Sequence, residues 1–204
     1  MMSNLSKGIY KLDSTHHQNV SKLRLDYLKK AQGFIAADDV LVWNHTDDKN
    51  VILGAIDSTN TLIATLRVDI INSSKELSTK IDFDNLQIED ELPVGLLGKA
   101  VTLEDYQGMG LNSYLRLIAF NYLRNKGIKK AIGTIIPGAP RHSLMKQLGY
   151  QFIENKEGWR RYGYKSESET LICVLDLEKN WDKINEILQP LTTKLKEEFP
   201  IHEI

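Results

Sequence analysis

The sequence is poor in the residues and runs that mark several protein classes. Cys173 is the single cysteine among 204 residues, which excludes an intrachain disulfide and a zinc site built on several cysteines. We interpret Cys173 as a small core residue in the apolar run 171–177, and the scarcity of cysteine fits a reducing cytoplasm. No run approaches about 18 apolar residues, and residues 1–9 have no signal-peptide core, so we expect no membrane span.

The chain also lacks an excess of positive or negative charge. The chain has 26 Lys and Arg against 27 Asp and Glu, a balance that argues against a general nucleic-acid binder. Its five histidines show no HxxxH or HExxH spacing, so we predict no metal site. With 42% hydrophobic residues the chain can bury one core, which predicts a single domain over 1–204 with a C-terminal helical extension at 178–204.

Hydrophobic periodicity predicts alternating strands and helices. Residues 17–32 form an amphipathic helix capped by Ser14 and Thr15. The expected strands are 51–56 and 62–70, paired as a hairpin, then 93–103 and 131–136. Residues 72–85 are interpreted as a loop, and Pro190 as the start of a second helix after a break in the C-terminal helical pattern. This order indicates a mixed sheet with helices on its faces.

The most informative run follows the strand 93–103 and precedes a helix that extends to residue 126. It reads Tyr106-Gln107-Gly108-Met109-Gly110-Leu111-Asn112. A strand that turns through glycines into a helix leaves first-turn N–H groups pointing at the loop, where a phosphate is the natural ligand. Glycines let the ligand reach the backbone and allow positive φ. The alternative interpretation is ordinary turn chemistry.

In this region the chain resembles the GNAT (GCN5-related) N-acyltransferase superfamily. The run from Gln107 to Asn112 is similar to the family's [R/Q]-x-x-G-x-[G/A] pyrophosphate loop, although Asn112 stands where a small residue is usual. It is followed by Lys126-Gly127-Ile128, the strand 131–136 and Leu148-Gly149-Tyr150, in the family's order. The resemblance covers residues 93–150. It implies an α/β (α+β) GNAT fold, with a mixed, mostly antiparallel twisted sheet, helices on both faces and splayed central strands.

The resemblance also implies an acyl thioester donor, usually acetyl-coenzyme A or another acyl-coenzyme A. The residues expected to bind it are Val101, Leu103, Gln107, Gly108, Met109, Gly110, Leu111 and Asn112. A pantetheine arm carries amides, so it can pair with an exposed strand edge as a peptide would. Gly95 and Gly98 suit a bulge that opens this edge. Close packing of these glycines under a helix is the alternative.

Catalysis in this family is direct attack of an amine on the thioester, which depends mainly on positioning and on backbone N–H groups. Candidate general bases are Glu91 and Glu104, each in a short acidic run whose alternative role is a solvated loop. The family's usual proton-donating tyrosine is replaced by Met145. His142 and Ser143 are the candidate replacements, with Tyr150 or water as further alternatives.

A narrower resemblance concerns the acceptor. The strand around Arg67, the Gly98-Lys99-Ala100-Val101 segment and the missing tyrosine resemble the N-acyl amino acid synthase and autoinducer synthase-like branch. It implies a long-chain donor on acyl carrier protein. Arg67 would bind a substrate carboxylate bidentately, or else form a structural ion pair.

Other partners follow from the remaining segments. A small-molecule amine or amino acid is the expected acceptor. The basic and aromatic stretch 155–165 is a candidate contact for the donor's phosphates or for a carrier protein, with a solvated hairpin tip as the alternative. The C-terminal helix covers the sheet, closes an acyl pocket or forms a homodimer.

Overall fold

Seven strands form one open sheet in the part of the chain that the computed structural model describes, which is residues 5–29, 41–78, 91–135, 139, 141–153, 171–202 and 204. The strands lie in the order β1-β2-β3-β4-β5-β7-β6. Their bounds are β1 Gly8–Leu12, β2 Val51–Ile56, β3 Leu62–Ile71, β4 Val94–Thr102, β5 Lys130–Ile135, β6 Gln151–Ile153 and β7 Leu171–Asp176. Within this sheet β4 and β5 pair in parallel, and the other neighbours pair antiparallel.

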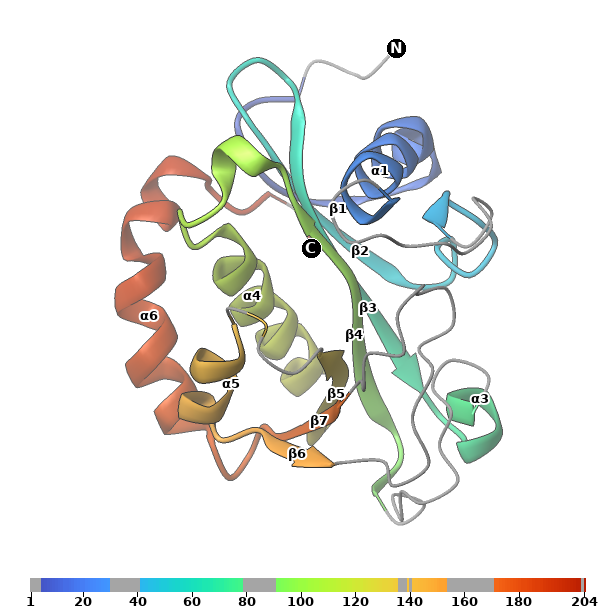
Figure 1. Ribbon diagram of the computed structural model, residues 1–204, viewed down its shortest axis with the longest axis vertical. Coiled ribbons are helices and arrows are strands. Elements are labelled where there is room, and N and C mark those ends of the chain that lie inside the picture. The colour runs from blue at the N-terminus through green and yellow to red at the C-terminus, as the bar shows by residue number, and fades with distance from the viewer. Residues whose placement is uncertain are drawn as a thin grey trace.

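Helices cover both faces of the sheet. They are α1 His17–Arg24, α3 Ser74–Ser78, α4 Leu111–Asn125, α5 His142–Leu148 and α6 Trp181–Glu198. Short helical turns lie at η1 Ser14–His16, η2 Leu25–Lys29 and η4 Glu104–Tyr106. Figure 1 shows α4 and α6 on one side of β3 and β4, and α1 on the other. The predicted fold class is confirmed.

The central helix α4 is held in position by its apolar face, which packs in the main core. Its buried side chains, Leu111, Tyr114, Leu115, Leu117, Ile118, Ala119, Phe120 and Leu123, belong to the main core with residues of β2, β3 and β7. Cys173 of β7 is buried in the same core, as predicted. The helix ends before Gly127, whose φ of 75° stops the helical path.

Strands β4 and β5 diverge after two paired positions. Gly95 pairs with Ala131 and Leu96 with Ile132, but β4 continues to Thr102 and β5 to Ile135. From residue 97 to 102, the edge of β4 that faces β5 therefore has no strand partner among the described residues. These are the splayed central strands that the sequence predicts.

On its other edge β4 contains a β-bulge. Its register with β3 shifts between Thr65, which pairs with Val101, and Arg67, which pairs with Gly98. Lys99 and Ala100 thus stand opposite one residue of β3, and Lys99 has a φ of 48°. The predicted bulge follows Gly98 directly. Gly95 instead packs under α4, because a Cβ there would overlap the Leu123 side chain.

Four element predictions need correction or fall partly outside the described residues. The polar segment 72–85 contains α3, and α6 continues through Pro190 because its buried positions 184, 188, 192 and 195 keep one helical face. Strand β1, of five residues, and strand β6, of three, were not predicted. The helix expected at 17–32 is described only to residue 29, where α1 passes into a π-type turn, and the stretch 155–165 lies outside the described residues.

The two glycines of β4 provide a matched stability test. We expect Gly95→Ala to lower the free energy of unfolding by about 1–3 kcal/mol, because the new methyl group overpacks the contact with Leu123. Gly98→Ala should change it by less than about 0.5 kcal/mol, because no described atom lies within 4 Å of its Cβ position. Chemical denaturation of both variants measures the difference, and equal losses would contradict this packing.

Candidate functional site

The loop between β4 and α4 forms an anion-binding geometry. Gly108 and Gly110 have φ values of 76° and 88°, in the left-handed region that favours glycine. Gly110 is the N-cap of α4 and supplies no side-chain cap, so the amides ahead of Tyr114 lack intrahelical acceptors. A Cβ on Gly108 would meet no described atom within 4 Å. Among the described residues, open space thus lies against backbone donors at a helix N-terminus, which suits a phosphate group.

A buried hydrogen-bond network holds the start of this loop. The Tyr106 hydroxyl donates to Asp57 Oδ2 at 2.7 Å, and Asp57 Oδ1 accepts from the Thr59 and Thr61 backbone amides at 2.8 and 2.9 Å. Burial alone would raise the pKa of the Asp57 carboxyl, but these hydrogen bonds outweigh it and hold the pKa below its usual value. The β2–β3 turn therefore fixes η4 and the loop that follows it, a role the sequence did not indicate.

The other predicted donor residues differ in exposure. Gln107 and Met109 are exposed, with Gln107 Nε2 donating to the Thr102 carbonyl at 3.3 Å, while Val101 and Leu111 are buried. Leu103 is half-buried, and its amide donates to Ile63 at 2.8 Å. The Asn112 side chain accepts from Arg116 Nε at 2.8 Å. It therefore points along α4, which explains how the loop accommodates a residue larger than the family's usual one.

Beside the β4 bulge lies a buried charge cluster of Arg24, Asp47, Arg67, Asp69 and Lys99. Arg24 binds Asp47 bidentately at 2.9 and 3.1 Å, and both side chains are fully buried. Arg67 donates to Asp69 Oδ2 through Nε and Nη2 at 3.1 and 2.8 Å, and its Nη1 lies 3.5 Å from Asp47. Lys99 Nζ lies 3.3 Å from Asp47 Oδ2. The cluster holds three cations and two carboxylates.

The structure thus places Arg67 in an ion pair, which was the alternative interpretation of this residue. Sequence reasoning missed Arg24, Asp47 and Lys99. A basic residue inside an apolar strand is costly to bury unless it is paired or faces a ligand, and this signal is present at Lys99 as it is at Arg67. Arg24 and Asp47 carry no comparable signal, because their meeting depends on α1 and residues 44–50 packing together.

Three members of the cluster have shifted pKa values, and burial lowers the pKa of Arg24 although its pairing with Asp47 opposes this shift. Burial, followed by the positive charges of Arg24 and Arg67, lowers the pKa of Lys99 to about 8. Burial alone would raise the pKa of Asp47, but hydrogen bonds from Arg24 and the surrounding cations outweigh it and keep the pKa below its ordinary value. Asp47 is therefore an anion at neutral pH, and Lys99 loses its charge above about pH 8.

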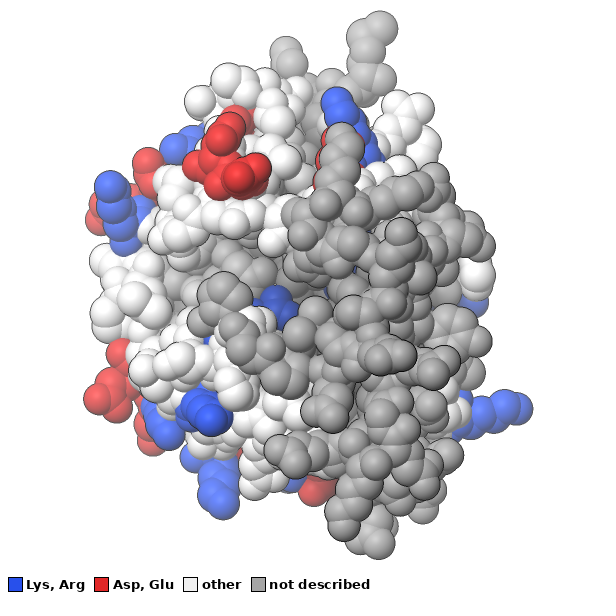
Figure 2. All heavy atoms as spheres, viewed as in Figure 1, with Lys and Arg blue, Asp and Glu red and all other residues white. Residues whose placement is uncertain are grey.

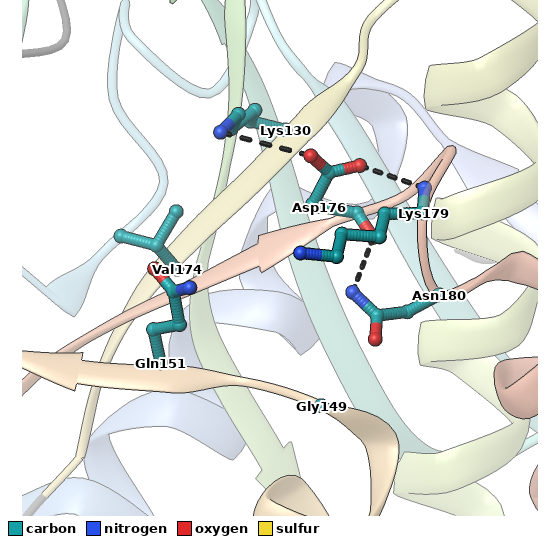
Figure 3. Close-up of a pocket in the computed structure, with 7 residues that line it drawn as sticks. All are labelled: Lys130, Gly149, Gln151, Val174, Asp176, Lys179 and Asn180. Atoms are coloured by element: carbon teal, nitrogen blue, oxygen red, sulfur yellow. Dashed lines mark hydrogen bonds and ion pairs between the residues drawn. The ribbon is translucent and has the colours of Figure 1, made fainter.

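The two candidate bases lie at opposite ends of β4. Glu104 is exposed in η4, and Figure 2 shows acidic side chains gathered over this element. Glu91 precedes β4 and pairs with Lys130 Nζ at 2.7 Å. Lys130 also lines a polar pocket of about 190 Å³ with Asp176, Lys179 and Asn180, where the polar groups pair largely with one another (Figure 3). Only Glu104 is next to the glycine loop.

The candidate proton donors lie on and after α5. This helix begins beside the end of β5, where Arg141 Nη2 donates to the Thr134 carbonyl at 3.4 Å. His142 is half-buried with its ring edge-on to Phe152, and Ser143 is exposed. His142 therefore lies near the end of β5 and beside β6. Met145 is buried in the core, and burial raises the pKa of the nearby Tyr150 phenol.

Two absences hold for the described part of the chain. No cluster of three or more His, Cys, Asp or Glu side chains there could hold a metal ion. No helix among the described residues is long and apolar enough to cross a membrane.

The fold is similar to that of several solved N-acetyltransferases and of an N-acyl amino acid synthase. An N-acetyltransferase from Staphylococcus aureus Mu50 matches with a TM-score of 0.58 and 14% identity, covering 85% of this chain and 99% of that one. The ribosomal-protein-S18-alanine N-acetyltransferase from Escherichia coli matches with 0.58 and 12%, covering 83% and 93%. An N-acyl amino acid synthase from uncultured soil microbes matches with 0.65 and 10%, covering 87% and 94%.

At these identities the likeness establishes the fold. No family model matches the sequence, and no curated protein sequence matches it. The GNAT fold predicted from residues 93–150 is confirmed.

Lys99 gives a pH-dependent stability prediction. At pH 7 the buried ammonium costs stability, so Lys99→Met should raise the free energy of unfolding by about 2 kcal/mol. Between about pH 8 and the unfolded pKa of 10.5, the native state has lost this proton and the unfolded state retains it. Wild-type stability therefore gains over that window, and the advantage of the variant shrinks.

Lys130→Met is the control, because the hydrogen bond to Glu91 raises the pKa of Lys130 and its loss should lower stability at pH 7. Denaturation curves from pH 6 to 10 test both variants. A destabilised Lys99→Met protein at pH 7 would contradict the assigned electrostatics.

Proposed function

We propose that the protein is an N-acyltransferase that moves an acyl group from a thioester donor to an amine. The observation that carries the proposal is the continuity of two features. The free edge of β4, residues 97–102, leads directly into a loop with two left-handed glycines and an uncapped helix N-terminus. This arrangement suits a ligand with amides followed by a pyrophosphate, which is the chemistry of coenzyme A.

Donor binding is assigned to the backbone more than to side chains. Residues 97–102 would pair with the pantetheine amides, and Gln107, Gly108, Met109, Gly110, Leu111 and Asn112 would surround the pyrophosphate. We favour acyl-coenzyme A over acyl carrier protein, because Glu104 and Asp105 are exposed beside the loop and disfavour docking of an acidic carrier. The protein is proposed to act in the cytoplasm.

The reaction needs only modest chemistry. The neutral amine nitrogen attacks the thioester carbonyl carbon, the C–N bond forms, and the C–S bond breaks with its electron pair on sulfur. Backbone N–H groups at the β4 bulge are proposed to stabilise the oxyanion. Glu104 is the proposed proton acceptor at the loop end of β4. His142 or Ser143 is the proposed donor to the thiolate, a weak base that needs little help.

A second candidate is a long-chain N-acyl amino acid synthase-like enzyme. The synthase from soil microbes has the highest TM-score of the three structures compared above, and Met145 is buried where many family members have a tyrosine. The same burial of Met145 supports a non-catalytic module that binds acyl-coenzyme A. The preferred acyl-chain length of the donor distinguishes the synthase-like enzyme, and the absence of turnover distinguishes the non-catalytic module.

Donor binding and turnover can be measured separately. Acetyl-coenzyme A, decanoyl-coenzyme A and coenzyme A should each raise the melting temperature, since a ligand at 100 times its dissociation constant adds about 2.7 kcal/mol. Thiol release with a panel of amines then measures transfer. A shift without release from any amine would favour the module, and no shift with any of the three would contradict the proposed donor site.

The loop assignment has an isosteric test at Gly108, where a Cβ would meet no described atom within 4 Å. Gly108→Asp should weaken coenzyme A binding at least about 100-fold, because it adds a negative charge to the loop proposed to surround the phosphates. Gly108→Asn has the same shape and tolerates positive φ, so it should weaken binding far less. Calorimetric titration compares the two dissociation constants, and equal values would falsify the electrostatic role of this loop.

A further inference from the structure

Among the described residues, the charge cluster beside the β4 bulge has three cations and two carboxylates, and so one more cation than carboxylate. Asp47 forms a bidentate pair with Arg24, and Asp69 accepts both a Nε and a Nη2 hydrogen bond from Arg67. Within the described part of the chain, the ion-pair partner of Lys99 is Asp47, whose Oδ2 lies 3.3 Å from Lys99 Nζ and also accepts a hydrogen bond from Arg24. No other described carboxylate is paired with Lys99. Lys99 is thus the surplus charge.

A buried surplus charge is costly unless an opposite charge reaches it. The Lys99 side chain is 15% exposed, whereas those of Arg24 and Asp47 are fully buried. A ligand can therefore approach the cluster at Lys99. Because the surplus is one positive charge, a monoanion completes the cluster at three cations and three anions.

Two further observations mark space and an unused polar group on the same face of the sheet. Gly98 pairs with Arg67, and a Cβ on Gly98 would meet no described atom within 4 Å. The Thr65 hydroxyl, on the same face of β3 as Arg67, is fully buried and has no hydrogen-bond partner among the described residues. The bulge therefore combines the Lys99 cation with space beside Gly98 among the described residues, and the buried Thr65 hydroxyl lies on the same face of the sheet.

The bulge also places Lys99 next to residues 97–102, where the thioester donor is proposed to bind. Residues 97–102 present their free edge toward β5, while Lys99 reaches the α1 side, where Arg24 and Asp47 lie. A molecule bound at Lys99 would approach the donor from the face of the sheet that α1 covers.

We propose that Lys99 binds the carboxylate of the acyl acceptor, so that the acceptor is an amine that also carries a carboxylate, as an amino acid does. This inference rests on the proposed N-acyltransferase function. It transfers the carboxylate-binding role from Arg67, which Asp69 occupies, to Lys99. Arg67 and Arg24 become positioning residues that hold Asp47 and keep the field at Lys99 positive.

The test compares acceptors that differ only in the carboxylate. The twenty common L-amino acids and their amides are assayed for thiol release with acetyl-coenzyme A and decanoyl-coenzyme A. At least one acid should be preferred over its amide by about tenfold or more in kcat/KM. Lys99→Met should remove this preference by raising KM for the acid, with little effect on the amide.

Lys99→Arg separates charge from structure. It should keep the preference for the acid, and it should also remove a pH effect. Above about pH 8 the wild type loses the Lys99 charge, whereas an arginine stays charged. The ratio of the wild-type KM to the Lys99→Arg KM for one amino acid should therefore rise above pH 8. Ionisation of the acceptor amine affects both enzymes equally and cancels in this ratio. The charged groups that face Lys99 from the neighbouring elements are Asp47, Asp69, Arg24 and Arg67.

Each outcome decides between the two proposals. Equal kcat/KM for acid and amide, or an equal loss with both in Lys99→Met, would overturn the carboxylate role and leave acyl transfer standing. If no acceptor causes thiol release from the donor, the amino acids are tested as ligands by thermal shift. A shift in the wild type that Lys99→Met lacks supports the site without transfer, and coenzyme A binding without any acid-dependent shift overturns the site alone.

Discussion

The divergence of β4 from β5 is the constraint on which the rest of this structure depends. Two paired positions, Gly95 with Ala131 and Leu96 with Ile132, hold the strands together in parallel. Beyond them the backbone groups of β4 must find other partners, because unpaired polar groups are costly when buried. The bulge at Lys99 strengthens the local twist and turns the strand toward η4 and the glycine loop. A free strand edge thus leads without interruption into an uncapped helix.

The two faces of β4 serve different purposes. On the α4 face the packing is apolar, and Gly95 lets the Leu123 side chain approach the strand. On the α1 face, residues from α1, the segment 44–50, β3 and β4 bring buried charges together. Asp47 is central there, because it contacts Arg24, Arg67 and Lys99. Removing Asp47 would leave three cations without their shared anion, which is far costlier than loss of a surface pair.

Much of the fold could be predicted from the sequence because its signals are local. The hairpin of β2 and β3 follows from apolar runs around turn residues, and the loop with Gly108 and Gly110 follows from glycines before an amphipathic helix. The bulge itself could be placed only approximately, because the residue with positive φ is Lys99 and not a glycine. The continuity of α6 through Pro190 depends on tertiary packing of its buried face, which overrides the local preference of proline. The Arg24–Asp47 pair joins residues 23 positions apart, and no local pattern reveals such a pair.

Hydrogen exchange of backbone amides tests the central claim most directly, because it reports on the strand edge and the loop at the same time. The protein would be compared with and without saturating acetyl-coenzyme A. Our account predicts slower exchange in residues 97–102 and 108–113, with little change in β1, β2 and the polar pocket near Lys130. Binding without added protection in either segment, or protection centred elsewhere, would contradict the assignment of β4 and its glycine loop as the donor site.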